Sequence, residues 1–223
     1  MKTNFVTYCD EKYEQHRSVL IDMGKREFDQ NHHYKPDDIE KSFYTENKKI
    51  LDLPRGAGYW LWKPYFILKT MEKINDGDII FYLDSGDYFN YGLSQYLKLL
   101  MNQNDIVLVP SSNKQRCYTK RDCFVMMDLD LEEYWNATQV EAGIVVVKKT
   151  ERSKKIIEEW LEYSKNENII TDIPNVSGKE NFPCFVDHRH DQSIISNLAK
   201  KYNLLLDNRI RRWVTCNVVV KNA

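Results

Sequence analysis

The feature that most restricts the fold of this chain is a continuous apolar run that ends in acidic residues. Residues 77–83 have the sequence Gly-Asp-Ile-Ile-Phe-Tyr-Leu, and Asp84, Ser85, Gly86 and Asp87 follow directly. A run of this kind, bounded by turn residues, is typical of a strand buried on both faces of a parallel sheet. The sequence therefore predicts an α/β fold with these acidic residues at the end of an interior strand.

Strand and helix patterns alternate along the chain, as they do in doubly wound folds. The predicted strands are residues 4–8, 28–34, 77–83, 105–110, 140–147 and 213–220. The predicted helices are residues 11–24, 35–50, 65–74, 94–101, 123–134, 151–163 and 191–202. We expect one Rossmann-related α/β domain over residues 1–223, with a mostly parallel central sheet flanked by helices. Its nucleotide-binding half would end near residue 110, and residues 111–223 would form the acceptor side.

Charge and composition exclude several classes of function. The 32 Lys and Arg residues against 33 Asp and Glu residues give a net charge of -1, which offers no basic field for nucleic acid. No segment has the length and apolarity of a membrane span or a signal peptide, so we expect a cytoplasmic protein without a membrane span. The five cysteines are irregularly spaced, and we expect all of them to be reduced.

The acidic residues after the buried strand are the first candidates for chemistry. Ligands of open α/β sheets bind beyond the carboxyl ends of the strands, where Asp84 and Asp87 are expected. Mg²⁺ and Mn²⁺ prefer carboxylate and diphosphate oxygens, and Gly86 permits a tight turn. The alternative is a solvated acidic turn. The D-x-D sequences at residues 76–78 and 128–130 are discounted, since the first precedes its strand and the second lies in a predicted helix.

Three ordered motifs resemble the GT-A class of nucleotide-sugar glycosyltransferases. They are residues 82–87, the strand beginning Glu141-Ala142-Gly143, and Asp191-Gln192 at the start of a late helix. The likeness is greatest to the retaining enzymes of family 8, of the glycogenin and bacterial galactosyltransferase type. The segment Gly58-Tyr59-Trp60-Leu61-Trp62-Lys63-Pro64 is also similar to a small glycosyltransferase domain encoded by chlorella viruses and to relatives in capsule loci.

The resemblance implies roles for individual residues. Asp84 and Asp87, with Ser85 and Gly86 between them, would hold Mn²⁺ or Mg²⁺ and contact the ribose, although their spacing is one residue longer than D-x-D. Glu141, Ala142 and Gly143 would line the donor sugar pocket, with Glu141 in the place of the usual Asn. Asp191 and Gln192 would lie near the reacting carbon. The family's late H-x-G-x-x-K-P-W motif is absent, so His188, His190, Lys63 or arginines of residues 209–212 would replace it.

Other side chains have a structural alternative of similar weight. Trp60 and Trp62 would stack on sugars or fill the core. Lys63 would meet a phosphate or lie at the surface. Thr7 and Tyr8 would contact the nucleotide or simply pack at the end of the first strand. His188 and His190 would bind metal or belong to a charged loop, and Asp191 would also serve as a helix N-cap.

The combined prediction is a hexosyltransferase that moves glucose, galactose or rhamnose from a UDP-sugar to a glycan hydroxyl. An oxocarbenium-like transition state requires a cation beside the departing diphosphate and a negative group beside the anomeric carbon. UDP, retention of configuration and a viral or capsule glycan as product follow from the resemblance alone. Two alternatives stay open: a sugar-nucleotide pyrophosphorylase, and a non-catalytic carbohydrate-binding domain.

Overall fold

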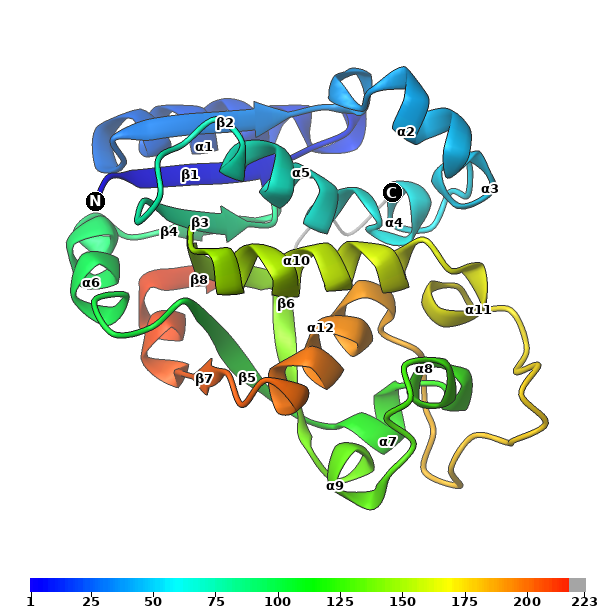
Figure 1. Ribbon diagram of the computed structural model, residues 1–223. Helices are drawn as coiled ribbons and strands as arrows, with labels where there is room; N and C mark the ends of the chain where they lie inside the picture. Colours follow the sequence, from blue (N-terminus) through cyan, green and yellow to red (C-terminus); the bar gives the residue numbers. More distant parts are fainter. Residues whose placement is uncertain (217–223) are drawn as a thin grey trace.

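The computed structural model describes residues 1–216, which are built around a six-stranded sheet (Figure 1). The strands are β1 (Thr3–Tyr8), β2 (Gln30–Tyr34), β3 (Ile79–Leu83), β4 (Asp87–Phe89), β5 (Ile106–Lys114), β6 (Thr138–Lys148), β7 (Leu205–Leu206) and β8 (Val214–Cys216). The order in the large sheet is β2-β1-β3-β6-β5-β7, and β4 and β8 form a separate antiparallel pair. Of the predicted strand 213–220, residues 217–220 lie outside the described residues.

The central sheet is mixed. Strand β1 runs parallel to β2 and β3, and β5 runs parallel to β7, whereas β6 is antiparallel to both β3 and β5. The predicted α/β fold with a helix-flanked central sheet is therefore confirmed, with one reversed strand inside the sheet. The carboxyl ends of β1 and β3 lie on the same edge, because these neighbouring strands run in the same direction.

Within residues 1–216, five helices of eight or more residues cover the sheet, and shorter ones connect them. The longer helices are α1 (Glu14–Glu27), α5 (Trp62–Met71), α6 (Leu93–Leu100), α10 (Glu151–Ser164) and α12 (His190–Lys201). The shorter ones are α2 (Lys41–Glu46), α3 (Lys48–Leu51), α4 (Gly56–Tyr59), α7 (Gln115–Tyr118), α8 (Arg121–Met126), α9 (Glu132–Trp135) and α11 (Glu167–Ile170). Three 3₁₀ turns span Glu11–Tyr13, Pro36–Asp38 and Asn208–Trp213. None of the helices in residues 1–216 is long and apolar enough to cross a bilayer, and the cytoplasmic location stays a prediction.

Two predicted helices are wrong in extent. The predicted helix 123–134 is interrupted because Asp128 adopts the left-handed conformation (φ 56°), which ends α8 before α9 begins. The predicted helix 35–50 is a 3₁₀ turn followed by α2 and α3, with the break at Asn47 (φ −111°). The D-x-D sequence at 128–130 therefore lies at a helix end and not within a helix, and Asp130 is paired with Arg121.

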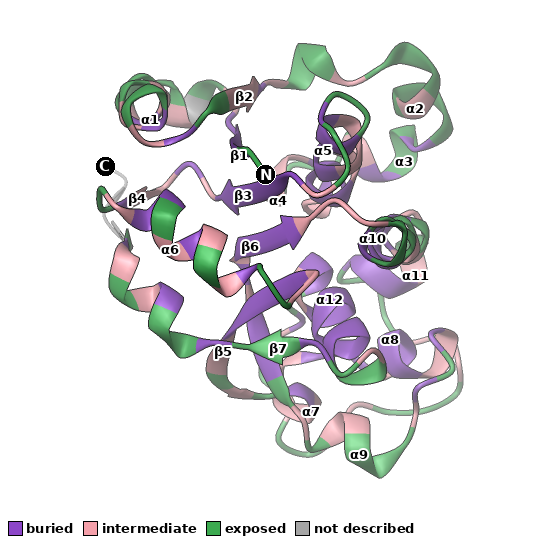
Figure 2. Ribbon diagram, turned by 60° about the vertical axis from the view of Figure 1, so that its left-hand side comes forward, coloured by how far each residue is buried: buried purple, intermediate pink, exposed green. Residues whose placement is uncertain are grey.

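Two apolar layers enclose the sheet, and alternate side chains of β3 face one layer or the other. Ile80 and Tyr82 face the layer built with α5, α10 and α12, whereas Ile79, Phe81 and Leu83 face the layer built with α1 and α6. Figure 2 shows the central strands buried while the outer helix surfaces are exposed. Burial on both faces explains the unbroken apolar run in the sequence.

The prediction that all cysteines are reduced is wrong. Cys117 of α7 and Cys184 form a disulfide across 67 residues, with Cα atoms 5.0 Å apart. Cys9 and Cys123 are free and buried. Irregular spacing did not reveal the pair because the fold alone brings α7 beside residue 184.

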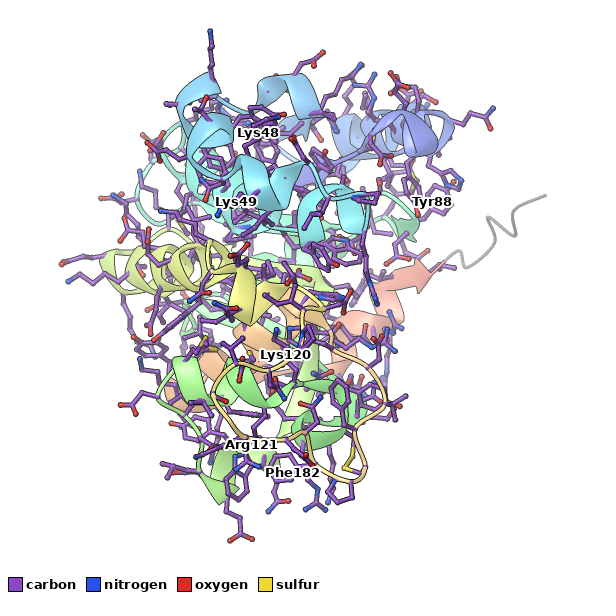
Figure 3. The ribbon with its side chains drawn as sticks, turned by 90° about the vertical axis from the view of Figure 1, so that its right-hand side faces the viewer. Lys48, Lys49, Tyr88, Lys120, Arg121 and Phe182 are labelled. Carbon is purple, nitrogen blue, oxygen red and sulfur yellow. A yellow bond between two sulfur atoms is a disulfide. The ribbon has the colours of Figure 1, made fainter. Side chains whose placement is uncertain are left out.

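The disulfide links α7 to a long segment, residues 171–189, that contains no helix or strand. Asp122 accepts hydrogen bonds from the amides of Val176 and Ser177 at 2.6 and 3.2 Å. The Arg121 guanidinium lies 4.3 Å from the centre of the Phe182 ring, and Figure 3 shows these two side chains together below Lys120. Irregular segments of this length are uncommon inside a folded domain, and this one leads into α12.

Candidate active site

A cleft of about 560 Å³ opens where the carboxyl ends of β1 and β3 meet the segment before α5. Three stretches of chain line it: Tyr8, Cys9, Asp10, Tyr13 and His16; Pro54, Gly56, Ala57, Trp60 and Trp62; and Asp84, Ser85, Gly86 and Asp87. The strand-end rule predicted that the four acidic-turn residues reach a cleft, and they do; their roles stay a prediction. The same rule, applied to the residues after β1, would have found Asp10, Tyr13 and His16, which the sequence analysis missed.

Asp84 is held through one oxygen of its carboxylate, and the other oxygen lies against β6. Its Oδ1 accepts a 2.5 Å hydrogen bond from the Tyr82 hydroxyl and lies 3.3 Å from the Lys63 ammonium. Its Oδ2 lies close to Gly143 on β6, where a Cβ atom would stand only 2.9 Å away. The Asp87 amide donates to the Asp84 carbonyl at 3.1 Å, which closes the acidic turn. A Cβ atom at position 143 would therefore displace this carboxylate.

Lys63 is a buried counter-ion and not an exposed phosphate ligand. Its ammonium lies 2.9 Å from Asp191 and 3.3 Å from Asp84, and donates to the Ala142 carbonyl at 3.1 Å. Its side chain is only 2% exposed, and it is absent from the cleft lining. Burial, the largest influence, lowers the Lys63 pKa, but the two carboxylates outweigh it and the net shift is upward.

Asp191 lies in the first turn of α12 and is almost fully buried. Burial raises the pKa of its carboxyl to about 6, and the neighbouring Lys63 opposes that shift. The adjacent Gln192 donates to Gln139 of β6 at 2.9 Å. Neither residue of the Asp-Gln pair lines the cleft, but Lys63 connects Asp191 to Asp84. The structure thus brings together two acids predicted from separate motifs.

Glu141 lies two residues before Gly143 on β6, at the point where the pairing register with β5 shifts. Its carboxylate forms a 2.9 Å ion pair with Arg211. Burial raises the Glu141 pKa, Arg211 lowers it and Asp87 raises it, and the net shift is upward. The influence of Asp87 places Glu141 in the electrostatic field of the acidic turn. The sequence analysis named the arginines of residues 209–212 only as a group. In the structure, Arg211 pairs with Glu141.

The two histidines are not at the cleft. His188 accepts from the Lys120 amide at its Nδ1 and contacts the Ile169 carbonyl at its Nε2, so both ring nitrogens are engaged. His190 contacts the Ile170 carbonyl through Nδ1 and stacks on Trp60 with ring centres 5.5 Å apart. Burial lowers the pKa of both rings. These contacts leave His188 no lone pair for a metal.

The donor set fits a cation that arrives with its substrate. Within residues 1–216, no three Asp, Glu, His or Cys side chains are arranged as a complete metal site. Mg²⁺ commonly takes one or two protein carboxylates and completes its shell with phosphate oxygens and water. Asp84 and Asp87 both line the cleft and are of the residue type that supplies such carboxylates.

The aromatic candidates divide between core and cleft. Tyr8 stacks on Trp62 at 3.8 Å, and the Trp62 indole donates to the Gly56 carbonyl at 3.0 Å. Both side chains are nearly buried, although they border the cleft. Trp60 is more exposed and forms part of the wall. Thr7 is fully buried and absent from the cleft lining.

The segment that carries Trp60 is a turn of left-handed helix. Gly56, Ala57, Gly58, Tyr59 and Trp60 have φ angles of 58°, 49°, 95°, 53° and 60°. This conformation costs about 1–2 kcal/mol for each residue with a Cβ atom. The glycines are needed, since a Cβ at position 58 would stand 2.7 Å from the Leu51 Cα. Strain of this kind clusters at functional sites.

Solved structures similar to this chain are glycosyltransferases. The bifunctional glycosyltransferase WbbM matches over 92% of this chain and 38% of its own, with a TM-score of 0.52 and 13% identity. The glycosyltransferase GlyE of Streptococcus pneumoniae TIGR4 matches over 94% and 46%, with a TM-score of 0.50 and 14% identity. A glycosyltransferase involved in the glycosylation of the major capsid of PBCV-1 matches over 78% and 72%, with a TM-score of 0.46 and 11% identity.

This chain spans less than half the length of the WbbM and GlyE chains. No protein-family model matches it, and no curated protein matches its sequence. At these identities the likeness establishes the fold alone, and it is the fold shared with WbbM and GlyE, as the resemblance predicted.

Proposed function

We propose that this chain is a metal-dependent glycosyltransferase that moves a sugar from a UDP-sugar to a hydroxyl of a glycan acceptor. The observation that carries the proposal is the position of Asp84 and Asp87 on the floor of a cleft, at the carboxyl end of β3. The glycosyltransferase fold supports it. Glucose, galactose or rhamnose as donor sugar, retention of configuration, a viral or capsule glycan as product, and one domain over residues 1–223 belong to the same proposal.

In this proposal the carboxylates of Asp84 and Asp87 hold Mn²⁺ or Mg²⁺, which would neutralise charge on the departing diphosphate. Tyr82 and Lys63 orient Asp84 so that its Oδ2 is directed away from the ion pair. Gly143 leaves room for that oxygen. A role of Asp191 near the reacting sugar carbon also belongs to the proposal; its carboxylate lies beneath the cleft lining and is connected to the acidic turn through Lys63, which pairs with both Asp191 and Asp84. Glu141 pairs with Arg211 beside the acidic turn, outside the residues that line the cleft, and its contact with the donor sugar also belongs to the proposal.

A thermal-shift experiment tests the proposal. UDP with Mn²⁺ at 100 times its dissociation constant stabilises a protein by about 2.7 kcal/mol, which is a rise in Tm of about 5–10 °C for a domain of this size. We expect that rise for the wild type and its loss in Asp87→Asn. Asp76→Asn is the matched control, because Asp76 belongs to a D-x-D sequence and is 90% exposed.

The outcomes separate a nucleotide-sugar site from a carbohydrate-binding domain. A rise with UDP that requires Mn²⁺ and Asp87 supports the nucleotide-sugar site. A rise with free sugars, independent of nucleotide and metal, would instead identify a carbohydrate-binding domain. Equal shifts in Asp87→Asn and Asp76→Asn would remove the acidic turn from the binding site.

A further inference from the structure

The left-handed turn of residues 56–60 is tied to a distant part of the chain by three polar contacts. The Arg55 guanidinium lies 2.9 Å from Asp172 and 3.4 Å from Asp187. The Tyr59 hydroxyl donates to Asp172 at 3.0 Å. Asp172 and Asp187 lie near the two ends of the irregular segment 171–189, so these contacts join one wall of the cleft to the segment that leads into Asp191.

Trp60 depends on that turn for its position. Its indole folds back over Gly56, where a Cβ atom would stand 2.5 Å from the ring. On the other side the indole stacks on His190 at an interplanar angle of 19°, and Tyr59 meets the same imidazole edge-on with ring centres 4.9 Å apart. His190 itself has a left-handed backbone (φ 51°). Strained backbone persists only where the surroundings over-determine it, and the contacts to Asp172 supply part of that restraint.

We propose that Arg55, Tyr59 and Asp172 are positioning residues that hold the left-handed turn in place and so fix Trp60 as a wall of the cleft. The indole then presents a flat apolar surface to the ring of the sugar being transferred. The sugar-facing role of Trp60 rests on the proposed function, whereas the restraint of the turn does not. Loss of the Asp172 contacts releases the turn toward right-handed or extended backbone and removes that wall.

Amide hydrogen exchange tests the restraint directly. The amides of Ala57, Gly58, Tyr59 and Trp60 all donate to carbonyls within residues 53–56, so they exchange only when the turn opens. We expect Asp172→Ala to speed their exchange about tenfold, and Tyr59→Phe, which removes one hydroxyl, to speed it about threefold. Strand β3 amides should be unchanged.

The matched control is Glu159→Ala. Glu159 also accepts from a tyrosine hydroxyl and a cation, Tyr202 and Lys201, but it joins α10 to the end of α12, and none of the three lines the cleft. We expect no change in exchange of residues 57–60 in this variant. The proposal would be overturned if the amides of residues 57–60 exchanged at the wild-type rate in Asp172→Ala. If Asp172→Ala does not fold, the exchange rates of residues 57–60 in Tyr59→Phe are compared with the wild type instead, and equal rates would overturn the proposal.

The sugar-facing role has its own measurement. In an active wild type, we expect Asp172→Ala to raise the KM for the donor sugar about tenfold with kcat largely retained, because a wall is lost while the reacting groups stay. A loosened turn with an unchanged KM would overturn that role and leave the restraint standing. Because amide hydrogen exchange needs no substrate, it tests the restraint of the left-handed turn even if the chain transfers no sugar.

Discussion

Replacing Lys63 by Met tests the electrostatic arrangement beneath the cleft. Met has similar length, so the change removes the ammonium while largely keeping the packing against Trp62 and Tyr82, whose rings lie 5.8 and 5.3 Å from Nζ. It leaves the buried carboxylate of Asp191 without the cation that lies 2.9 Å away. Asp84, which is partly exposed, loses less because water reaches it.

The magnitude follows from breaking a buried ion pair on one side. Such a change costs about 3–5 kcal/mol, since one charge stays buried and uncompensated. We therefore expect Lys63→Met to lower the free energy of unfolding by about that amount at pH 8. At pH 5, below the folded-state pKa of about 6, Asp191 is largely protonated, and we expect roughly half that loss.

In the wild type, Asp191 makes the free energy of unfolding depend on pH. The folded-state pKa of Asp191, about 6, lies above the ordinary value of 3.8. The folded protein therefore binds this proton more tightly than the unfolded chain does. The contribution of Asp191 to stability is greatest below pH 3.8 and falls by about 3 kcal/mol as the pH rises through 6. Lys63→Met should move this fall to higher pH.

Urea denaturation at pH 5 and pH 8 measures these effects. The double variant Lys63→Met with Asp191→Asn should recover much of the stability at pH 8, because no buried charge is left unpaired. Lys148→Met is the control: Lys148 also donates to a backbone carbonyl and lies 3.6 Å from a carboxylate, that of Asp105. We expect a loss of about 1 kcal/mol or less there. A loss in Lys63→Met that is independent of pH and not recovered in the double variant would refute the reasoning.

Three further changes test other parts of the site. Gly143→Ala places a Cβ 2.9 Å from Asp84 Oδ2, so we expect at least tenfold weaker binding of UDP with Mn²⁺ by calorimetry; unchanged affinity would show that this oxygen is not a ligand. Cys117→Ser removes the disulfide to Cys184, which joins residues 67 positions apart. We expect the free energy of unfolding in chemical denaturation to fall by about 4 kcal/mol, and equal stability in wild type and variant would contradict this. Asp191→Asn should abolish sugar transfer in a product assay while UDP binding is retained, and normal turnover would exclude Asp191 from the mechanism.

The sequence by itself determined the layers of the fold and one edge of the site. Burial of β3 on both faces demands apolar residues without interruption, so the strand and the polar turn after it are visible in residues 79–87. Alternation of strands and helices then predicted the class of fold. Because clefts form at the carboxyl ends of such strands, the sequence placed Asp84 and Asp87 at a cleft without knowledge of any contact.

Only the tertiary structure decided which charges and thiols meet. Lys63 and Asp191 are 128 positions apart, and Cys117 and Cys184 are 67 apart, so their pairing depends on how helices pack on the sheet. The direction of β6 and the left-handed backbone at residues 56–60 depend equally on packing. Local patterns record how far a residue is buried, because burial acts on each residue type separately. They do not record its partners, because a contact requires two segments to be placed together by the rest of the fold.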